Sequence, residues 1–378
     1  MTEYEDRLAQ EKQRFDAEVC VHDLPEIFHY WSNTYLRPFI NSFGYDGIDD
    51  FFVQEIADAP RRSGEPLRIA SVGCGDCGPE IGIARALRER GVADFRMVCL
   101  DISEGALERG RANAREAGLA AHFEMIAHDF NQGLPAGTFD VVVANQSLHH
   151  VVELERLYAA ISAQLAPQGR FLVSDMIGRN GHMRWPEARV LVDEAWESLP
   201  DRYRFNWQLQ RQEQAFMDWD CSQEGFEGIR AEEVLPLLLE YFQPRVFLAW
   251  GNIIDVFIDR GFGHNFHGRG EWDLRFIDRI HAVDSAAIAE GRIKPTHLLA
   301  RFQNEPGDCL CPPGMTPHSA VRVVEARPQA SSEPAAGHGS LPRDPRPRPL
   351  PLPQGLKDAL RAAFPGLVPL YRRLRGLD

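Results

Sequence analysis

The stretch that decides the fold is Leu67-Arg-Ile-Ala-Ser-Val-Gly-Cys-Gly-Asp-Cys-Gly-Pro-Glu-Ile81, read together with Met97-Val-Cys-Leu-Asp-Ile-Ser103. An apolar strand enters a glycine-rich turn, a helix begins near Pro79, and a second apolar strand ends in the acid Asp101. Glycines at such a turn let a ligand approach the backbone, and the free N–H groups of the helix attract negative charge. An acid at the end of the next strand can accept hydrogen bonds from ribose hydroxyls. The stretch therefore predicts a nucleoside-cofactor site.

The same rhythm of strand and helix continues from 67 to 178. Apolar runs predict strands at 67–72, 95–100, 122–128, 139–145 and 169–175. The helices between them have boundary residues, with Ser103 as an N-cap and Gly91 and Gly118 as stops. This alternation predicts an α/β fold with a doubly wound, mostly parallel sheet.

The rest of the chain divides into segments of different composition. Residues 1–66 predict a helical N-terminal cap, and 67–303 a main α/β domain in which strands at 246–250 and 296–302 complete a seven-stranded sheet. Two stretches interrupt this domain, at 179–228 and 251–295. Because they lie outside the regular alternation and hold many aromatic and polar residues, we expect them to bind the substrate.

The end of the chain differs from everything before it. Residues 304–353 are rich in Pro, Ser, Gly and Arg, which predicts a disordered linker. Residues 354–378 regain apolar residues and form a basic amphipathic segment. From 341 to 378 there are eight Lys or Arg and three Asp, a net charge of +5. Such an end predicts contact with a membrane surface or another protein, although a solvated tail without a role is equally consistent with it.

Composition excludes several classes of protein. The net charge of -14 argues against a general nucleic-acid binder, and the acidic N-terminus lacks the apolar core of a signal peptide. The seven cysteines are an odd number, which favours a reducing compartment and a cytoplasmic protein. Cys74-x-x-Cys77 has the spacing of a zinc or redox motif, but both residues lie in a turn that needs small side chains. We therefore expect no metal site.

Five ordered motifs resemble those of the class I S-adenosylmethionine-dependent methyltransferases. They are Val72-Gly-Cys-Gly75, Asp101, His128-Asp-Phe-Asn131, Phe139-Asp-Val-Val-Val-Ala-Asn-Gln-Ser-Leu-His-His150 and Leu165-Ala-Pro-Gln-Gly-Arg-Phe-Leu-Val-Ser-Asp175. The resemblance covers 67–178 well and extends more loosely to 302. It implies S-adenosylmethionine as the cofactor.

The resemblance also implies a role for each cofactor-binding position. The methionine part would be bordered by Gly73, Cys74, Gly75 and Gly78, and the ribose and adenine would be held by Asp101, Ile102, Asp129 and Phe130. Asn145 would lie where the fourth strand meets the transferred methyl group. One departure concerns Ser71, because the family often has an acid at this position, two residues before the first glycine.

Methyl transfer to a hydroxyl group benefits from a general base, and histidine suits this role because its pKa lies near neutrality. The expected catalytic residues are His149, His150 and His182, with Asp175 as a partner. The predicted reaction is O-methylation of a polar small molecule or glycan. Two alternatives stay open. The glycine fingerprint followed by Asp101 also fits a dehydrogenase that uses NAD, and the chain could be a catalytically silent cofactor-binding scaffold.

Overall fold

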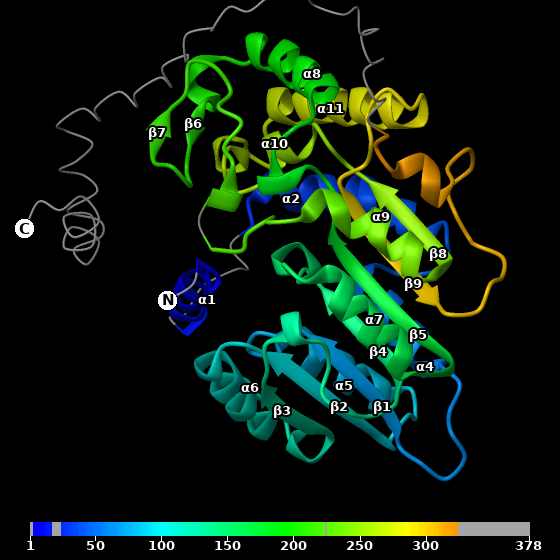
Figure 1. Cartoon of the computed structure of the whole chain (residues 1–378). Helices are drawn as coiled ribbons and strands as arrows, with labels where there is room; N and C mark the ends of the chain where they lie inside the picture. The colour runs from blue at the N-terminus through cyan, green and yellow to red at the C-terminus, as the bar shows by residue number, and fades with distance from the viewer. Residues whose placement is uncertain (1–2, 17–23, 224, 324–378) are drawn as a thin grey trace, which may run out of the picture. The chain divides into compact units, whose positions relative to one another are not determined.

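The structure is a computed structural model that describes residues 3–16, 24–223 and 225–323 (Figure 1). Its centre is a sheet of seven strands: β1 (Leu67–Val72), β2 (Phe95–Asp101), β3 (Phe123–Ala127), β4 (Phe139–Asn145), β5 (Leu165–Met176), β8 (Gln243–Trp250) and β9 (His297–Gln303). The strands follow the order β3-β2-β1-β4-β5-β9-β8. Strand β9 runs in the direction opposite to that of the other six strands of this sheet. The predicted mostly parallel, seven-stranded sheet is confirmed.

Helices cover both faces of this sheet. One face packs against α4 (Ile48–Ala57), α5 (Gly78–Glu89) and α6 (Glu104–Glu116), and the other against α7 (Leu154–Gln164) and α9 (Ala231–Tyr241). Successive side chains of β2 alternate between the two cores, with Cys99 on the α5 side and Leu100 on the α7 side. Both sides of the strand are apolar because both are buried.

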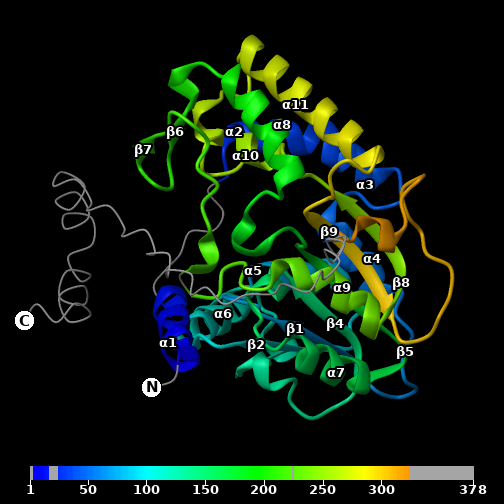
Figure 2. The same cartoon turned by 45° about the horizontal axis from the view of Figure 1, so that its top comes forward.

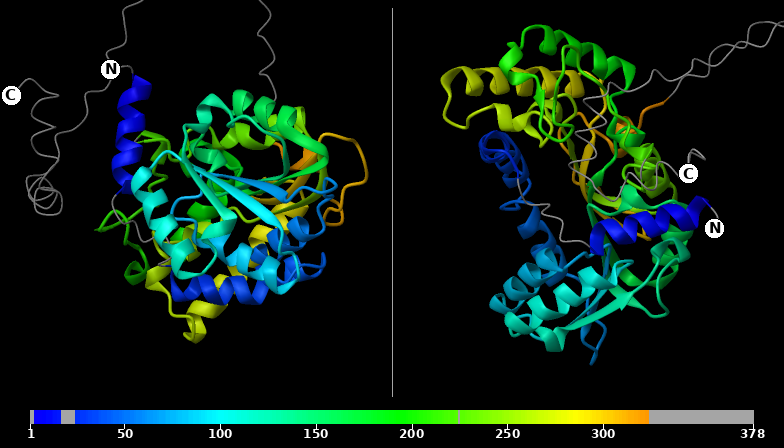
Figure 3. Two further views of the ribbon diagram at one scale, coloured as in Figure 1. Left: turned by 90° about the horizontal axis from the view of Figure 1, so that it is seen from below. Right: turned by 90° about the vertical axis from the view of Figure 1, so that its left-hand side faces the viewer.

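The remaining N-terminal helices are α1 (Glu3–Asp16), α2 (Glu26–Trp31), the π-helix η1 (Ser32–Leu36) and α3 (Arg37–Asn41). These helices pack against different parts of the molecule. Helix α1 lies against α6, whereas α2 lies beside α10 (Asp255–Ile258) and α11 (Glu271–Ala289), as Figures 2 and 3 show. The N-terminal segment therefore contacts both the sheet domain and the segment 251–295.

The two predicted insertions contain most of the remaining elements. The first holds η5 (Asn180–His182), α8 (Pro186–Glu197), η6 (Asp201–Tyr203), η7 (Cys221–Gln223) and a hairpin of β6 (Phe205–Asn206) and β7 (Arg211–Gln212). The second holds α10, η8 (Gly263–Asn265) and α11. Helix α8 follows β5, and helix α10 follows β8. These two strands are parallel to each other, so both segments start at the carboxyl ends of the parallel strands. Short helical turns complete the main domain: η2 (Ala120–His122), η3 (Phe130–Gln132) and η4 (Leu148–His150).

The predicted start of the linker, residue 304, is wrong. Residues 304–323 belong to the same compact unit as the sheet. Leu310 pairs with the edge strand β8, because its carbonyl accepts from the Phe247 N–H at 2.9 Å. A short helical turn, η9 (Pro317–Ala320), then buries Ala320 against the core. The remainder of the predicted linker and the basic segment 354–378 lie outside the described residues.

None of the helices in the described ranges has the length and apolarity that a membrane-spanning helix needs.

A buried carboxylate joins the N-terminal segment to the sheet. Glu55 of α4 is 4% exposed, and it accepts hydrogen bonds from Tyr45, Arg170 and Arg301 at 2.7, 2.5 and 2.7 Å. Arg170 lies on β5 and Arg301 on β9, so one side chain links a helix to two strands. Removing one partner of a buried ion pair is costly, because the other charges stay buried without compensation.

We expect Glu55→Ala to lower the free energy of unfolding by about 3–5 kcal/mol, the usual cost of breaking a buried ion pair. Urea denaturation followed by circular dichroism would measure this change. Glu89→Ala removes an exposed glutamate from α5 and serves as the control, for which we expect almost no effect. Equal stability of the two variants would show that Glu55 does not anchor α4.

Candidate cofactor and catalytic site

The sheet changes direction between β1 and β4, which are adjacent and parallel although β2 and β3 separate them in the chain. In open α/β sheets a ligand binds in the crevice at such a switch point, outside the carboxyl ends of the strands. The glycine-rich turn after β1 and the turn after β4 both lie there. The topology therefore brings the predicted motifs to one edge of the sheet.

Two glycines of the turn after β1 serve different purposes. Gly73 has a φ of +71°, and a Cβ added to it would lie 2.5 Å from the Cβ of Ser147. Glycine is needed here because the turn after β4 packs against it. Gly75 has a φ of +54° and nothing within 4 Å of an added Cβ. The space next to Gly75 is open, as a turn that cradles a ligand requires.

Asp101 connects this turn to the end of β2. Its Oδ2 accepts from the Gly75 N–H at 2.8 Å, and its Oδ1 accepts from the Ser103 N–H at 2.8 Å. Burial raises the pKa of Asp101, and the two backbone donors oppose that shift. Each carboxylate oxygen has two lone pairs, so both oxygens can still accept from a pair of hydroxyls. The residue suits the predicted ribose site.

The predicted adenine end contains a contact that the sequence did not suggest. Asp129 accepts from the Asn131 N–H through Oδ1, and its Oδ2 accepts from the hydroxyl of Tyr4 at 2.7 Å. Tyr4 belongs to α1, so the N-terminal helix reaches this end of the site. Phe130 is buried in the core on the α7 side. Ile102 and Asn145 lie at the carboxyl ends of β2 and β4, as expected.

The structure also explains why Ser71 can stand where the family often has an acid. Its hydroxyl donates to Oε1 of Glu80 at 2.7 Å, and both residues are buried. Glu80 therefore places a carboxyl group next to the position where the family often has an acid. Burial, followed by the proximity of Cys77, raises the pKa of Glu80 to about 8. Cys74, which we expected at the cofactor, has its side chain buried among apolar residues.

The predicted catalytic residues meet on the other side of the switch point. Asp175, at the end of β5, is fully buried and accepts from the Ser147 and Leu148 N–H groups at 2.8 and 2.7 Å. It also lies 2.7 Å from Nδ1 of His149. Asp175 thus fixes the turn η4 and the orientation of the His149 ring. Because it is buried beneath that ring, it is a positioning residue.

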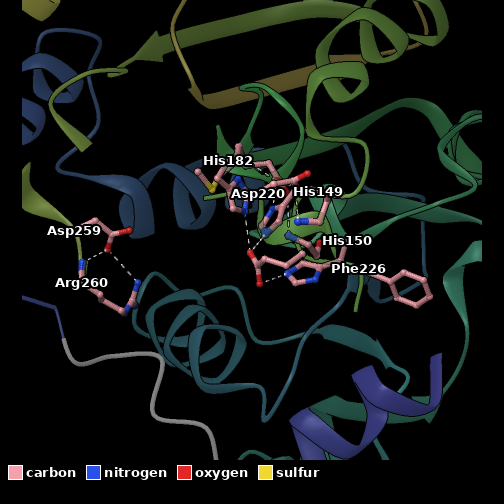
Figure 4. A network of polar contacts seen from close by, with 12 residues as sticks. His149, His150, His182, Asp220, Phe226, Asp259 and Arg260 are labelled. Atoms are coloured by element: carbon pink, nitrogen blue, oxygen red, sulfur yellow. Dashed lines mark hydrogen bonds and ion pairs between the residues drawn. The ribbon is translucent and has the colours of Figure 1, made fainter. Parts of the chain in front are cut away.

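All three predicted histidines surround one carboxylate, that of Glu227. The Glu227 carboxylate lies 3.4 Å from Nε2 of His149, 2.8 Å from Nε2 of His182 and 3.8 Å from Nε2 of His150. Figure 4 shows the three rings pointing toward one another. Burial opposes ionisation of Glu227, but the hydrogen bonds from His149 and His182 hold its pKa far below the ordinary value.

The two histidines on either side of Glu227 have opposite protonation tendencies. Burial favours neutral His149, but the Asp175 and Glu227 carboxylates raise its pKa to about 10. Burial lowers the pKa of His182, and the hydrogen bond to Glu227 only partly opposes this. At neutral pH His149 is therefore charged, and His182 is neutral. Nδ1 of His182 is buried and has no hydrogen-bond partner among the described residues.

The backbone holds His182 in an unusual conformation. Its φ is +56°, in the left-handed region, which residues other than glycine seldom adopt. Such strain costs of order 1 kcal/mol or more and is common at functional sites. The preceding Gly181 is also left-handed, with a φ of +63°, and its added Cβ would lie 1.9 Å from the Asp220 carboxylate. The loop is thus folded tightly to present the imidazole.

Sequence reasoning missed Glu227 and the contribution of α1. Glu11 is 2% exposed and lies 2.9 Å from Nδ1 of His150, and Arg14 lies 3.4 Å from the Glu227 carboxylate. No periodic pattern marks a buried glutamate, so only the fold identifies these residues.

Two groups within the described ranges have side chains that could hold a metal ion. One is His149, His182 and Glu227, and the other is Cys74, Cys77 and Cys99. In the first group the carboxylate already accepts hydrogen bonds from both imidazoles. The second group is not part of the network described so far.

Comparisons with known proteins agree with the geometry. Residues 66–221 match the family model described as a methyltransferase domain. Sterol 24-C-methyltransferase from Aspergillus fumigatus is 30% identical over 114 residues, which are 30% of this chain and 29% of that protein. The match thus spans less than a third of the relative's length. The match to the family model favours the methyltransferase expectation over the dehydrogenase that shares the glycine fingerprint.

Solved structures of similar proteins cover more of the chain at lower identity. Geranyl diphosphate C-methyltransferase from Streptomyces coelicolor A3(2) is 13% identical and covers 80% of this chain and 99% of its own, with a TM-score of 0.41. An O-methyltransferase from the trans-AT polyketide synthase of Brevibacillus brevis is also 13% identical, covers 80% and 88%, and has a TM-score of 0.38.

We expect Asp101→Ala to weaken S-adenosylmethionine binding about tenfold to a hundredfold, because hydrogen bonds to a charged group contribute about 1.5–3 kcal/mol each. Isothermal titration calorimetry would measure the dissociation constant. Asp94→Ala changes an exposed acid shortly before β2 and should leave binding unchanged. Wild-type affinity in Asp101→Ala would refute the ribose assignment, and NAD in a parallel titration should release no heat.

Proposed function

We propose that residues 66–221 form a class I S-adenosylmethionine-dependent methyltransferase domain and that the chain methylates a hydroxyl group of a polar small molecule or glycan. One observation carries this proposal. A neutral histidine, His182, has a buried and unpartnered Nδ1 and is backed through Nε2 by the Glu227 carboxylate. This is the arrangement of a general base with an orienting acid.

The cluster of Asp175, His149, Glu227 and His182 acts as a relay of hydrogen bonds. Asp175 holds charged His149, which donates to Glu227, and Glu227 accepts the Nε2–H of His182. That bond fixes the tautomer of His182 with its lone pair on Nδ1. Because Nδ1 is buried, acceptor binding has to displace the atoms that cover it. The acceptor hydroxyl then donates to this lone pair and loses its proton to it as the new bond forms. Glu227 then stabilises the imidazolium by its negative charge.

The cofactor supplies a methyl group that is already activated as a sulfonium. The protein's own part is therefore to align the acceptor and to receive its proton. Gly75 and Asp101 would hold the cofactor beside the turn after β1, and the cluster adjoins the turn after β4. Contact between Gly73 and Ser147 joins these two turns, which supports in-line placement of acceptor and cofactor.

The acceptor class is inferred from the segment that surrounds the base. His182 and Glu227 both belong to the predicted substrate segment 179–228, and a hydroxyl is the group whose proton such a base removes. Arg184, two residues after His182, is buried and its Nε has no hydrogen-bond partner among the described residues, which supports a polar acceptor. Aromatic and polar groups together suit a polar small molecule or glycan.

Turnover with cofactor labelled by ¹³C in its methyl group tests the proposal directly. The purified full-length chain would be incubated with a panel of hydroxylated small molecules, nucleotide sugars and glycans. A new ¹³C resonance in the O-methyl range supports the proposal. Methyl transfer to carbon or nitrogen would overturn the O-methylation reading, and cofactor binding without turnover on any acceptor would favour the silent scaffold.

We expect His182→Asn to reduce kcat about 10²- to 10⁴-fold, the usual contribution of a general base, with unchanged cofactor affinity. Asparagine tolerates the left-handed backbone and can still donate to Glu227, but it cannot accept the proton. His29→Asn, at an exposed position on α2, is the matched control. A variant at His182 with wild-type kcat would remove the residue from the mechanism.

The pH dependence of the rate provides a separate prediction. A base works in its neutral form, and burial lowers the pKa of His182 from its ordinary value of 6.5. The wild-type kcat should therefore stay constant down to pH 6.5 and fall only below it. A rate that declines from above pH 7 as the pH is lowered would contradict this assignment.

A further inference from the structure

Three buried cysteines that the proposed function does not use lie close together at the glycine-rich turn. Cys74 and Cys77 belong to the turn, and Cys99 lies on the neighbouring strand β2. Their sulfur atoms all lie within 4.8 Å of one another, and the side chains are 6%, 0% and 0% exposed. Sequence analysis assigned the pair in the turn to the need for small residues. The strand register adds the third thiol, from 22 residues further along the chain than Cys77.

The backbone at Cys77 indicates that a side chain is needed there. Its φ is +59° and its ψ is 23°, a left-handed conformation that glycine adopts without strain. For a residue with a Cβ this conformation costs about 1–2 kcal/mol. Gly73 and Gly75 in the same turn meet the same demand as glycines. A cysteine at the third left-handed position therefore has a use for its thiol.

The helix that begins after Cys77 contains a buried carboxylate in its first turn. Glu80 is 4% exposed and lies three residues after Cys77, in the first turn of α5. Its Oε1 accepts from Ser71, but its Oε2 is buried without a hydrogen-bond partner among the described residues. Buried polar atoms of native proteins almost always have a partner, so this oxygen needs one.

We propose that Cys74, Cys77 and Cys99 bind a thiophilic divalent cation, Zn²⁺, and that the Glu80 carboxylate, which lies outside this group, turns toward the ion as the fourth ligand. Zinc prefers four ligands in a tetrahedron and binds both thiolate and carboxylate. Bonds of about 2.3 Å place tetrahedral sulfurs about 3.8 Å apart, so the three thiols need only a small movement. Each thiol gives up a proton on binding, and no electron transfer is involved.

The surroundings suit the negative charge of such a site. Cys77 is the N-cap of α5, where the unpaired N–H groups of a twelve-residue helix stabilise a thiolate. The site would also link the turn after β1 to β2. Metal binding would in this way fix the turn whose Gly75 N–H contacts Asp101.

Cobalt is the probe that separates this site from the histidine cluster. Co²⁺ would be added to reduced, metal-free, full-length protein under anaerobic conditions, and the near-ultraviolet absorption recorded. Thiolate ligands give an intense sulfur-to-cobalt charge-transfer band that imidazole and carboxylate ligands cannot give. We expect the band to saturate at one equivalent and to disappear when Zn²⁺ is added. No band in the wild-type protein overturns the proposal.

Variants assign the band to these thiols. Cys99→Ala should abolish it, whereas Cys309→Ala should leave it unchanged. Cys309 is the matched control because its sulfur lies 3.5 Å from that of Cys311, which makes this pair the competing thiol site. A band that survives Cys99→Ala, or that is lost in Cys309→Ala, contradicts the assignment. If Cys99→Ala does not fold, Glu80→Gln tests the assignment instead. Loss of the fourth ligand should shift the band and weaken Co²⁺ binding at least tenfold, and an unchanged band and affinity would contradict the assignment.

Discussion

The buried carboxylate of Asp175 is the constraint on which the functional site depends. It lies at the end of β5 and holds both the backbone of the turn η4 and the ring of His149. The His149 N–H also points at this carboxylate, so one side chain satisfies four buried polar groups, which is how a charge can remain inside a protein. Replacing it would leave these donors unpaired and would release the turn that carries His149.

The turn η4 contacts both halves of the site, the glycine-rich turn and the histidine cluster. Ser147, held by Asp175, packs against Gly73 so closely that no Cβ fits between them. The glycine-rich turn is thereby fixed relative to the histidine cluster. On the other side, His149 orients Glu227, and Glu227 orients His182. The cofactor turn and the proposed base are thus parts of one packed network, although they come from segments more than a hundred residues apart.

The sequence predicted the parts of the fold that are encoded locally. A few neighbouring residues are enough to identify a strand–turn–helix unit that ends in glycine. The predicted N-cap at Ser103 is one example, because its hydroxyl accepts from the Ala106 N–H. Glu227 and Glu11 could not be predicted, because their roles arise only when distant segments meet. The Pro and Gly content of 304–323 predicted disorder, which is wrong. Pairing of Leu310 with the edge strand holds that segment in place.

The central claim is that His182 faces the transferred methyl group as the base. The most direct measurement is a crystal structure with S-adenosylhomocysteine bound at the site. We expect Nδ1 of His182 to point at the cofactor sulfur, across a gap that one hydroxyl group fills, with Glu227 still bound to Nε2. A ring turned away from the sulfur, or a gap closed by another side chain, would contradict it.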